Sequence, residues 1–321
     1  MLKERFIDFL RFEKRFSPHT IQSYRTDLGQ FEGYLSFQYN IIDIALADHL
    51  MIRSWIVSLL EQKLSPRSIN RKLSTLKSFF HFCLRIGVVT SNPTLKVTSP
   101  KVSRHLPVFI EKEKLETLFR DVDFGSGFES FRDRLMIMML YATGIRRSEL
   151  IGIRMPDLDL AKSTLKVMGK RSKERIIPLG SYLCSQTEIY MKERDSLLNR
   201  PAKLEGEGTA DFVKKMLKVD SEIDPQENNH DLLFVSEKGH KLNARNVYEI
   251  IHKYLSLISS QSKLSPHVLR HSFATHMLND GADLNSIKEL LGHTSLAATQ
   301  VYTHNTIEKL KLIYKQAHPR A

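Results

Sequence analysis

Apolar residues in the first third of the chain recur every three or four positions, the period of an α-helix with one face in a core. The pattern predicts four helices: over residues 6–16, from His19 onward, over His49–Gln62, and after Ser65-Pro66. The apolar positions of the first are Phe6, Phe9, Leu10, Phe12 and Phe16. Serine followed by proline precedes the second and fourth helices, and this pair is typical of an N-cap and a first helical residue. We therefore expect residues 1–97 to form a four-helix domain.

The fourth predicted helix has two chemically different faces. One is apolar and comprises Ile69, Leu73, Leu76, Phe79, Phe80 and Phe82. Such a stripe is typical of a core, although exposed aromatic residues also stack on single-stranded nucleic acid. The opposite face comprises Arg67, Asn70, Arg71, Ser74, Lys77 and Ser78. Basic and hydroxyl groups on one face suit DNA phosphates and base edges, and we expect Arg71 and Lys77 to contact DNA.

The pattern changes after Thr90, where the long apolar period is lost and three prolines follow by Pro107. This composition predicts a linker over residues 98–107, ahead of a second domain over residues 108–321. The basic residues of this stretch suit either a DNA backbone or an ordinary solvated connector, and composition does not decide between the two.

The second domain is predicted to be mostly helical with one hairpin. Helices are expected over Glu111–Phe119 and Arg134–Thr143, with Gly144 ending the second. Two β-like runs, Thr164–Met168 and Arg175–Leu179, flank a short basic tip and predict a small antiparallel sheet. The expected fold class is therefore mainly α, with two domains and a small antiparallel sheet in the second.

Three further segments shape the C-terminal half. Residues 199–231 hold 8 acidic and 5 basic residues, which predicts an exposed insertion. A helix over Asp283–Leu291 is expected to end at Gly292. His293 and Tyr302 are nine residues apart, nearly opposite each other on one unbroken helix, so a shared site requires the break that Gly292 supplies. Residues 306–321 predict an amphipathic tail helix.

Length and charge narrow the class of protein. A chain of 321 residues suits two domains. There are 48 Lys and Arg against 36 Asp and Glu, and residues 1–107 hold 16 of the basic but only 8 of the acidic residues. This excess favours a polyanionic partner, with a solvated helical surface as the alternative. Two separated cysteines make a disulfide framework or a zinc site improbable, and no segment resembles a signal peptide or a membrane span, so we expect a cytoplasmic protein with no membrane partner.

Six side chains together suggest a phosphate-handling site with its own nucleophile: Arg146, Lys170, His267, Arg270, His293 and Tyr302. Two guanidiniums suit the non-bridging oxygens of a phosphodiester, and imidazole and ammonium groups move protons. A cluster of carboxylates for Mg²⁺ does not accompany them, so we expect neither a metal nor another cofactor.

Each member also has an ordinary structural interpretation. Arg146 could pair with Glu149 at a helix end, and Lys170 could be a solvated residue of the hairpin tip. Its neighbours Arg171 and Lys173 are expected to contact phosphate. The histidines near Arg270 superficially suggest a metal site, but an arginine inside the cluster repels a cation.

These motifs, in this order, resemble those of the tyrosine recombinases of the Xer type, and the resemblance runs from SPHTIQSYRTDL to the terminal HPRA. It implies a core-binding N-terminal domain of the SAM-like kind and a C-terminal catalytic domain. It also implies that Tyr302 attacks the scissile phosphate, giving a 3′-phosphotyrosyl enzyme, while Arg146, Arg270 and His293 stabilise the transition state. His267 would accept a proton and Lys170 would protonate the leaving oxygen.

The resemblance further implies strand exchange through a Holliday junction on a double-stranded recombination site, with resolution of chromosome dimers at cell division as the expected role. The expected assembly is a tetramer, alone or with a second recombinase subunit, in which the 306–321 tail docks on a neighbour and a septal DNA translocase takes part. The alternatives are an integrase of a mobile element, a type IB topoisomerase and a non-enzymatic DNA-binding regulator. The insertion at 199–231 is longer than the compact Xer pattern requires.

Overall fold

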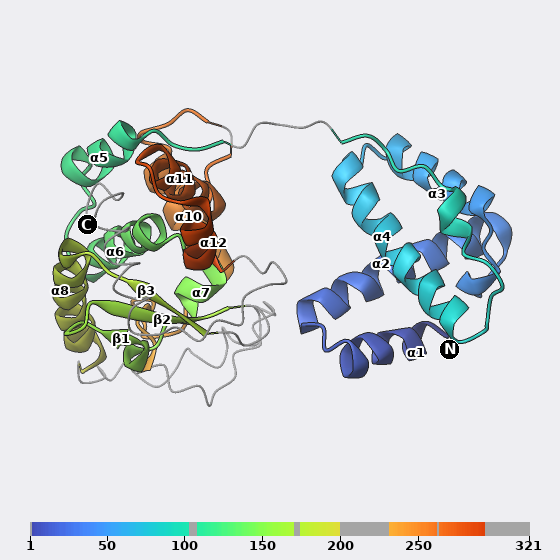
Figure 1. Cartoon of the computed structure of the whole chain (residues 1–321), viewed down its shortest axis with the longest axis horizontal. Coiled ribbons are helices and arrows are strands. Elements are labelled where there is room, and N and C mark those ends of the chain that lie inside the picture. The colour runs from blue at the N-terminus through green and yellow to red at the C-terminus, as the bar shows by residue number, and fades with distance from the viewer. Residues whose placement is uncertain (1, 103–107, 170–173, 200–230, 262, 293–321) are drawn as a thin grey trace, which may run out of the picture. The chain divides into compact units, whose positions relative to one another are not determined.

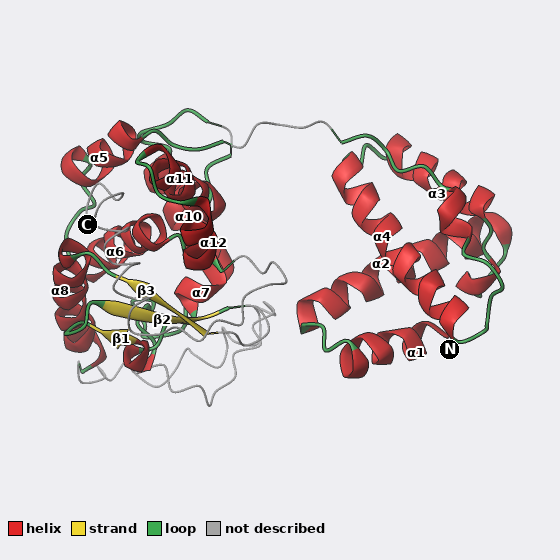
Figure 2. Ribbon diagram, in the orientation of Figure 1, coloured by secondary structure: helices red, strands yellow, loops and turns green. Residues whose placement is uncertain are grey.

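The chain divides into two compact units, Met1–His105 and Leu106–Ala321, in a computed structural model (Figure 1). The structure describes residues 2–102, 108–169, 174–199, 231–261 and 263–292. It confirms the mainly helical class, and within the described residues the strands form one small antiparallel sheet in the second unit (Figure 2). Each unit has its own hydrophobic core.

The first unit is built from four α-helices: α1 (Leu2–Asp8), α2 (Pro18–Tyr39), α3 (His49–Glu61) and α4 (Pro66–Arg85). Short 3₁₀ turns occur at Ile44–Leu46 and Pro93–Lys96. As predicted, Ser17 and Ser65 cap α2 and α4, and their hydroxyls accept hydrogen bonds from the backbone amides of Thr20 and Ser68. The apolar stripe of α4 lies in the core, with Phe79 and Phe80 fully buried.

The first predicted helix, over residues 6–16, is shorter than expected. After α1 the chain continues as a π-helical turn, Phe9–Glu13, and the amide of Lys14 donates to the carbonyl of Phe9. A π-turn advances five residues per hydrogen bond, so the apolar register of the helix is lost. Phe6 and Leu10 remain in the core, but Phe12 and Phe16 are 69% and 37% exposed, so the prediction that these two continue the apolar face was wrong.

A fully buried carboxylate, Asp27, joins α2 to α4. It accepts hydrogen bonds from Arg71, from Lys72 Nζ at 3.1 Å and from Thr75 Oγ1 at 3.0 Å. Lys72 is itself buried, whereas the Arg71 side chain is 52% exposed. Just before Arg71 on α4, Asn70 donates to the carbonyl of Pro100 at 2.9 Å, so this part of the stretch expected as a linker lies against the first unit.

The second unit contains α5 (Lys112–Asp121), α6 (Phe128–Thr143), α7 (Arg147–Ile151), α8 (Ser181–Leu198), α10 (Ala244–Leu255), α11 (Pro266–Asn279) and α12 (Leu284–Leu291). A 3₁₀ turn at Met155–Asp157 leads into the sheet. Helix α6 is buried along most of its length and packs against α8 and α11. It starts at Phe128 instead of Arg134. The predicted start was too late because Arg132 and Asp133, two charged residues that pair with each other in the interior, interrupt the apolar period near the start of the helix.

The sheet has the order β1 (Leu158–Asp159), β2 (Thr164–Met168) and β3 (Glu174–Pro178), all antiparallel. The register pairs Thr164 with Pro178 and Met168 with Glu174, which confirms the predicted hairpin. Leu165, Val167, Arg175 and Ile177 are buried, and β3 lies next to α12. None of the helices within the described ranges is long and apolar enough to cross a membrane.

Replacing Asp27 with alanine should destabilise the first unit by about 3 kcal/mol or more, because Lys72 would be left buried without its carboxylate. The chain has a single tryptophan, Trp55, which lies in the core of this unit, so urea unfolding followed by its fluorescence measures the loss. Glu4→Ala is the matched control, because its ion pair with Arg25 is largely solvated and should be worth under about 1 kcal/mol. Equal losses in the two variants would contradict the prediction.

Candidate active site

Arg146 is placed by the turn between α6 and α7. Gly144 ends α6 with a φ of +61°, and a Cβ added there would lie 2.5 Å from Phe273 and 2.7 Å from Leu291. Arg146 then stands at the N-cap of α7, where its backbone amide and its Nη1 each donate to the Glu149 carboxylate at 2.8 Å. The guanidinium also donates to the carbonyl of Gly292 at 3.2 Å. The ordinary pairing with Glu149 is therefore present, and it fixes the direction of the arginine.

Arg270 lies on α11 and is 9% exposed. Its Nη1 donates to the carbonyl of Gly144 and its Nη2 to the carbonyl of Leu291, both at 2.6 Å. Burial, together with the positive charges of Arg146 and Arg175, lowers the pKa of Arg270 to about 10, so the group remains a cation at neutral pH. His267 precedes it by one helical turn and is exposed.

A third arginine, Arg175 on β3, completes the arrangement. Its Nε donates to the carbonyl of Leu290 at 2.8 Å, and its two terminal nitrogens bind Glu149 at 3.0 and 2.8 Å. Three successive carbonyls at the end of α12, those of Leu290, Leu291 and Gly292, thus accept hydrogen bonds from three different arginines. The negative end of a helix dipole favours such cations.

Glu149 is the carboxylate that two of these guanidiniums share. Burial alone would raise the pKa of Glu149, but hydrogen bonds from Arg175 and from the amide of Arg146, with the charge of Arg175, bring it below its ordinary value. The group is therefore ionised at neutral pH. Two guanidiniums bind this carboxylate and a third, that of Arg270, is bonded to backbone carbonyls, so positive charge is in excess where Arg146 remains 29% exposed. Preorganised donors of this kind suit a phosphate or a developing negative charge.

The structure holds Arg146 and Arg270 on adjacent carbonyls at the end of α12, and His267 lies on the same helix as Arg270. The other expected site residues, Lys170, Arg171, Lys173, His293 and Tyr302, lie outside the described residues, as do most of the 199–231 insertion and the 306–321 tail. Within the described part of the chain, no three His, Cys, Asp or Glu side chains gather as a metal site would need.

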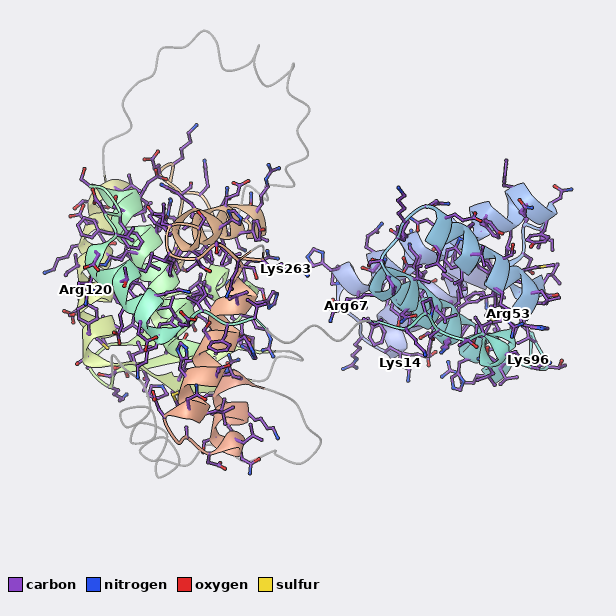
Figure 3. The ribbon with its side chains drawn as sticks, turned by 90° about the horizontal axis from the view of Figure 1, so that it is seen from above. Lys14, Arg53, Arg67, Lys96, Arg120 and Lys263 are labelled. Atoms are coloured by element: carbon purple, nitrogen blue, oxygen red, sulfur yellow. The ribbon has the colours of Figure 1, made fainter. Side chains whose placement is uncertain are left out.

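In the first unit, Arg71 and Lys77 are exposed on α4, and Arg67 lies on the surface near the start of the same helix (Figure 3).

Cys83 and Cys184 are buried in different units.

Sequence reasoning missed the place of Arg175. In the sequence it is only the first position of a predicted strand, but in the structure it shares the buried side of β3 with Ile177. An arginine at an inward-facing position of a short strand is a usable signal, because a buried guanidinium requires acceptors nearby. Glu149 was recognised as a local partner of Arg146, but nothing in its spacing revealed the second arginine.

Glu149→Gln should lower the stability of the second unit by about 3 kcal/mol at neutral pH, since Arg175 would lose its buried counter-charge. Because the pKa of Glu149 is lowered on folding, its contribution is present above the ordinary value of 4.5 and is lost as the pH falls through the lowered folded value. Calorimetric unfolding of wild type and variant should therefore converge in acid. Glu174→Gln is the control, because its pair with Lys166 is half solvated; a difference that persists unchanged in acid would refute the assignment.

Comparison with known proteins identifies the family. The Phage integrase family matches residues 109–309, and the Phage integrase N-terminal SAM-like domain matches residues 4–87. A protein named tyrosine recombinase XerC from Oceanobacillus iheyensis is 37% identical over 316 residues, covering 98% of this chain and 95% of the relative. A protein of the same name from Listeria innocua is 37% identical over 320 residues, covering 100% of this chain and 98% of the relative.

Solved structures share the fold. The XerH site-specific recombinase bound to a palindromic difH substrate aligns with a TM-score of 0.65 at 22% identity, over 97% of this chain and 83% of that one. The Tn1549 transposon integrase in complex with circular intermediate DNA aligns with a TM-score of 0.66 at 17% identity, over 96% and 98%. On the family matches and the full-length relatives, the chain belongs to the phage integrase family and is a tyrosine recombinase of the Xer type, an enzyme that breaks and rejoins DNA.

Proposed function

We propose that this chain is a site-specific recombinase that exchanges DNA strands through a 3′-phosphotyrosyl intermediate and a Holliday junction. The observation that supports this most directly is the fixed pair Arg146 and Arg270, each held by the backbone at the end of α12. In the sequence His293 follows that helix end immediately, and Tyr302 comes nine residues later. Two guanidiniums oriented before the substrate arrives suit the pentavalent transition state of phosphoryl transfer.

The proposed roles follow from charge and proton balance. The Tyr302 oxygen attacks the phosphorus, the bond to the 5′ oxygen breaks, and Lys170 gives a proton to that oxygen. His267 accepts the proton of the tyrosine, while Arg146, Arg270 and His293 bind the phosphate oxygens. The phosphodiester energy is kept in the tyrosyl linkage, and attack by a 5′-hydroxyl of the partner duplex rejoins the strand. Neither ATP nor a metal enters this balance.

Binding of the duplex is assigned to both units. On α4 of the first unit, Arg67, Arg71, Ser74 and Lys77 are exposed on the side opposite the core. Asp27 holds Arg71 through one nitrogen, and the Arg71 side chain remains 52% exposed. In the second unit, Arg171 and Lys173 of the hairpin tip are proposed as phosphate contacts. Such contacts fix the register of the protein on DNA.

The proposed biological role is resolution of chromosome dimers at cell division, as the resemblance to full-length proteins named XerC suggests. The assembly would be a tetramer on two sites, formed by one chain or with a second recombinase, with the 306–321 tail docked on the neighbouring subunit. A DNA translocase at the septum is the proposed additional partner.

Tyr302→Phe should abolish the covalent adduct while leaving DNA binding intact, because only the nucleophilic oxygen is removed. The test uses a nicked duplex that carries a chromosomal dimer-resolution sequence and scores an SDS-resistant protein–DNA adduct in the absence of metal. An adduct in the wild type alone establishes the nucleophile and the reaction class. An adduct that survives in Tyr302→Phe would transfer the nucleophile elsewhere, and binding without any adduct in either protein would favour a DNA-binding regulator.

Arg71→Ala and Lys77→Ala should each weaken DNA binding for all sequences and reduce the slope of log Kd against log salt by about 1, because each removes one phosphate contact. Fluorescence anisotropy over a series of salt concentrations measures the slope. Arg120→Ala is the control, since Arg120 on α5 is an exposed residue already paired with the adjacent Asp121 at 2.8 Å (Figure 3). Unchanged slopes in both α4 variants would remove this helix from the proposed interface.

A further inference from the structure

Arg175 is a buried arginine whose guanidinium is fully engaged by other parts of the protein. Its side chain is 5% exposed, and all three guanidinium nitrogens bind protein acceptors: one carbonyl of α12 and both oxygens of Glu149. A group so enclosed is not available to a phosphodiester. Arg175 instead contacts Glu149 and the end of α12, which are also the two groups that hold Arg146.

We propose that Arg175 is a positioning residue, which fixes Glu149 against the C-terminal end of α12 and thereby sets the direction of Arg146 and the start of the segment that leads to His293. This inference rests on the proposed function, since it assigns the orientation of the same site. Arg146 depends on two acceptors, the Glu149 carboxylate and the Gly292 carbonyl. Arg175 is bonded to the first of them and to the carbonyl of Leu290, two residues before the second.

The packing around Gly292 supports the inference independently of the hydrogen bonds. Gly292 has a φ of +62°, and a Cβ placed on it would lie 3.1 Å from Nη1 and 3.4 Å from Cδ and Cζ of Arg175. The backbone that ends α12 therefore passes directly over the guanidinium. A displacement of Arg175 moves both the residue before His293 and the carboxylate that orients Arg146.

A lysine cannot reproduce these contacts, although it keeps the charge. The ammonium is a point charge, whereas the planar guanidinium reaches a carbonyl on one side and both oxygens of a carboxylate on the other. Arg175→Lys would therefore retain a counter-charge for Glu149 and lose the bridge to α12. The variant separates the charge of Arg175 from its geometry.

Arg194→Lys provides a matched control in the same unit. Arg194 on α8 is 3% exposed, and it also donates from Nε to a backbone carbonyl, that of Leu232, at 2.9 Å and from Nη1 to a carboxylate, that of Asp195, at 2.9 Å. These two contacts involve neither α12 nor Glu149. The control alters a buried guanidinium that also joins a backbone carbonyl to a carboxylate, although the side chain of Asp195 is 56% exposed and that of Glu149 only 4%.

Single-turnover cleavage of the nicked duplex, at a temperature where all variants are folded, is the first measurement. We expect Arg175→Lys to slow adduct formation by roughly 10- to 100-fold, as for a small misplacement of a catalytic group, with DNA affinity within about 3-fold of wild type. Arg194→Lys should leave the rate within about 3-fold of wild type.

A double-mutant cycle with Arg146→Lys separates positioning from general destabilisation. If Arg175 acts through Arg146, adding Arg175→Lys to Arg146→Lys should slow cleavage further by no more than about 3-fold, because the two residues form one unit. Multiplicative losses in the cycle, or a loss in Arg175→Lys no larger than that in Arg194→Lys, would overturn the proposal.

Hydrogen exchange distinguishes failure of this inference from failure of the proposed function. Amides of the peptide covering Leu284–Leu291 should exchange faster in Arg175→Lys than in wild type or Arg194→Lys, whether or not the protein cleaves DNA. If wild type forms no adduct while the exchange of α12 increases as expected, the proposed function fails and the positioning of α12 by Arg175 stands. Unchanged exchange at α12 refutes the positioning itself.

Discussion

The end of α12 is the constraint on which the arrangement of the catalytic unit depends. Three successive carbonyls there accept hydrogen bonds from Arg175, Arg270 and Arg146, which come from β3, α11 and the turn before α7. Like charges would separate these side chains in water, so their convergence requires acceptors that are already fixed. The backbone of a helix end supplies such acceptors together with the negative end of its dipole. Glu149 then adds the counter-charge that keeps two of the cations close.

Glycine permits this convergence at two positions. Gly144 and Gly292 both adopt the left-handed conformation and end α6 and α12, so each helix stops where its last carbonyls can meet a guanidinium. A side chain at Gly144 would collide with Phe273 of α11. The close approach of α6, α11 and α12 at this point therefore depends on the absence of a side chain at Gly144.

How far the sequence predicted this structure depends on whether the signal was local. The Ser-Pro pairs, the aromatic face of α4 and the hairpin were readable because capping, helical period and strand alternation act over a few residues. The start of α6 and the π-turn after α1 were not, since a buried Arg132–Asp133 pair and a change of hydrogen-bond register leave no apolar periodicity. Arg146 and Arg270 were recognised from their motifs, but the bridge made by Arg175 depends on contacts with residues 26 and 115 positions away.

Arginine suits all three positions because of the shape of its guanidinium group. A guanidinium has five N–H donors in one plane, so it can bind a carbonyl or a carboxylate of the protein and still present donors in other directions. Arg146 combines both uses, since it is tied to Glu149 and Gly292 and remains partly exposed. An ammonium would have to give up one partner for the other. A cluster that holds three cations through backbone carbonyls therefore suits guanidiniums better than ammonium groups, because each guanidinium can keep its backbone acceptor and still offer donors in other directions.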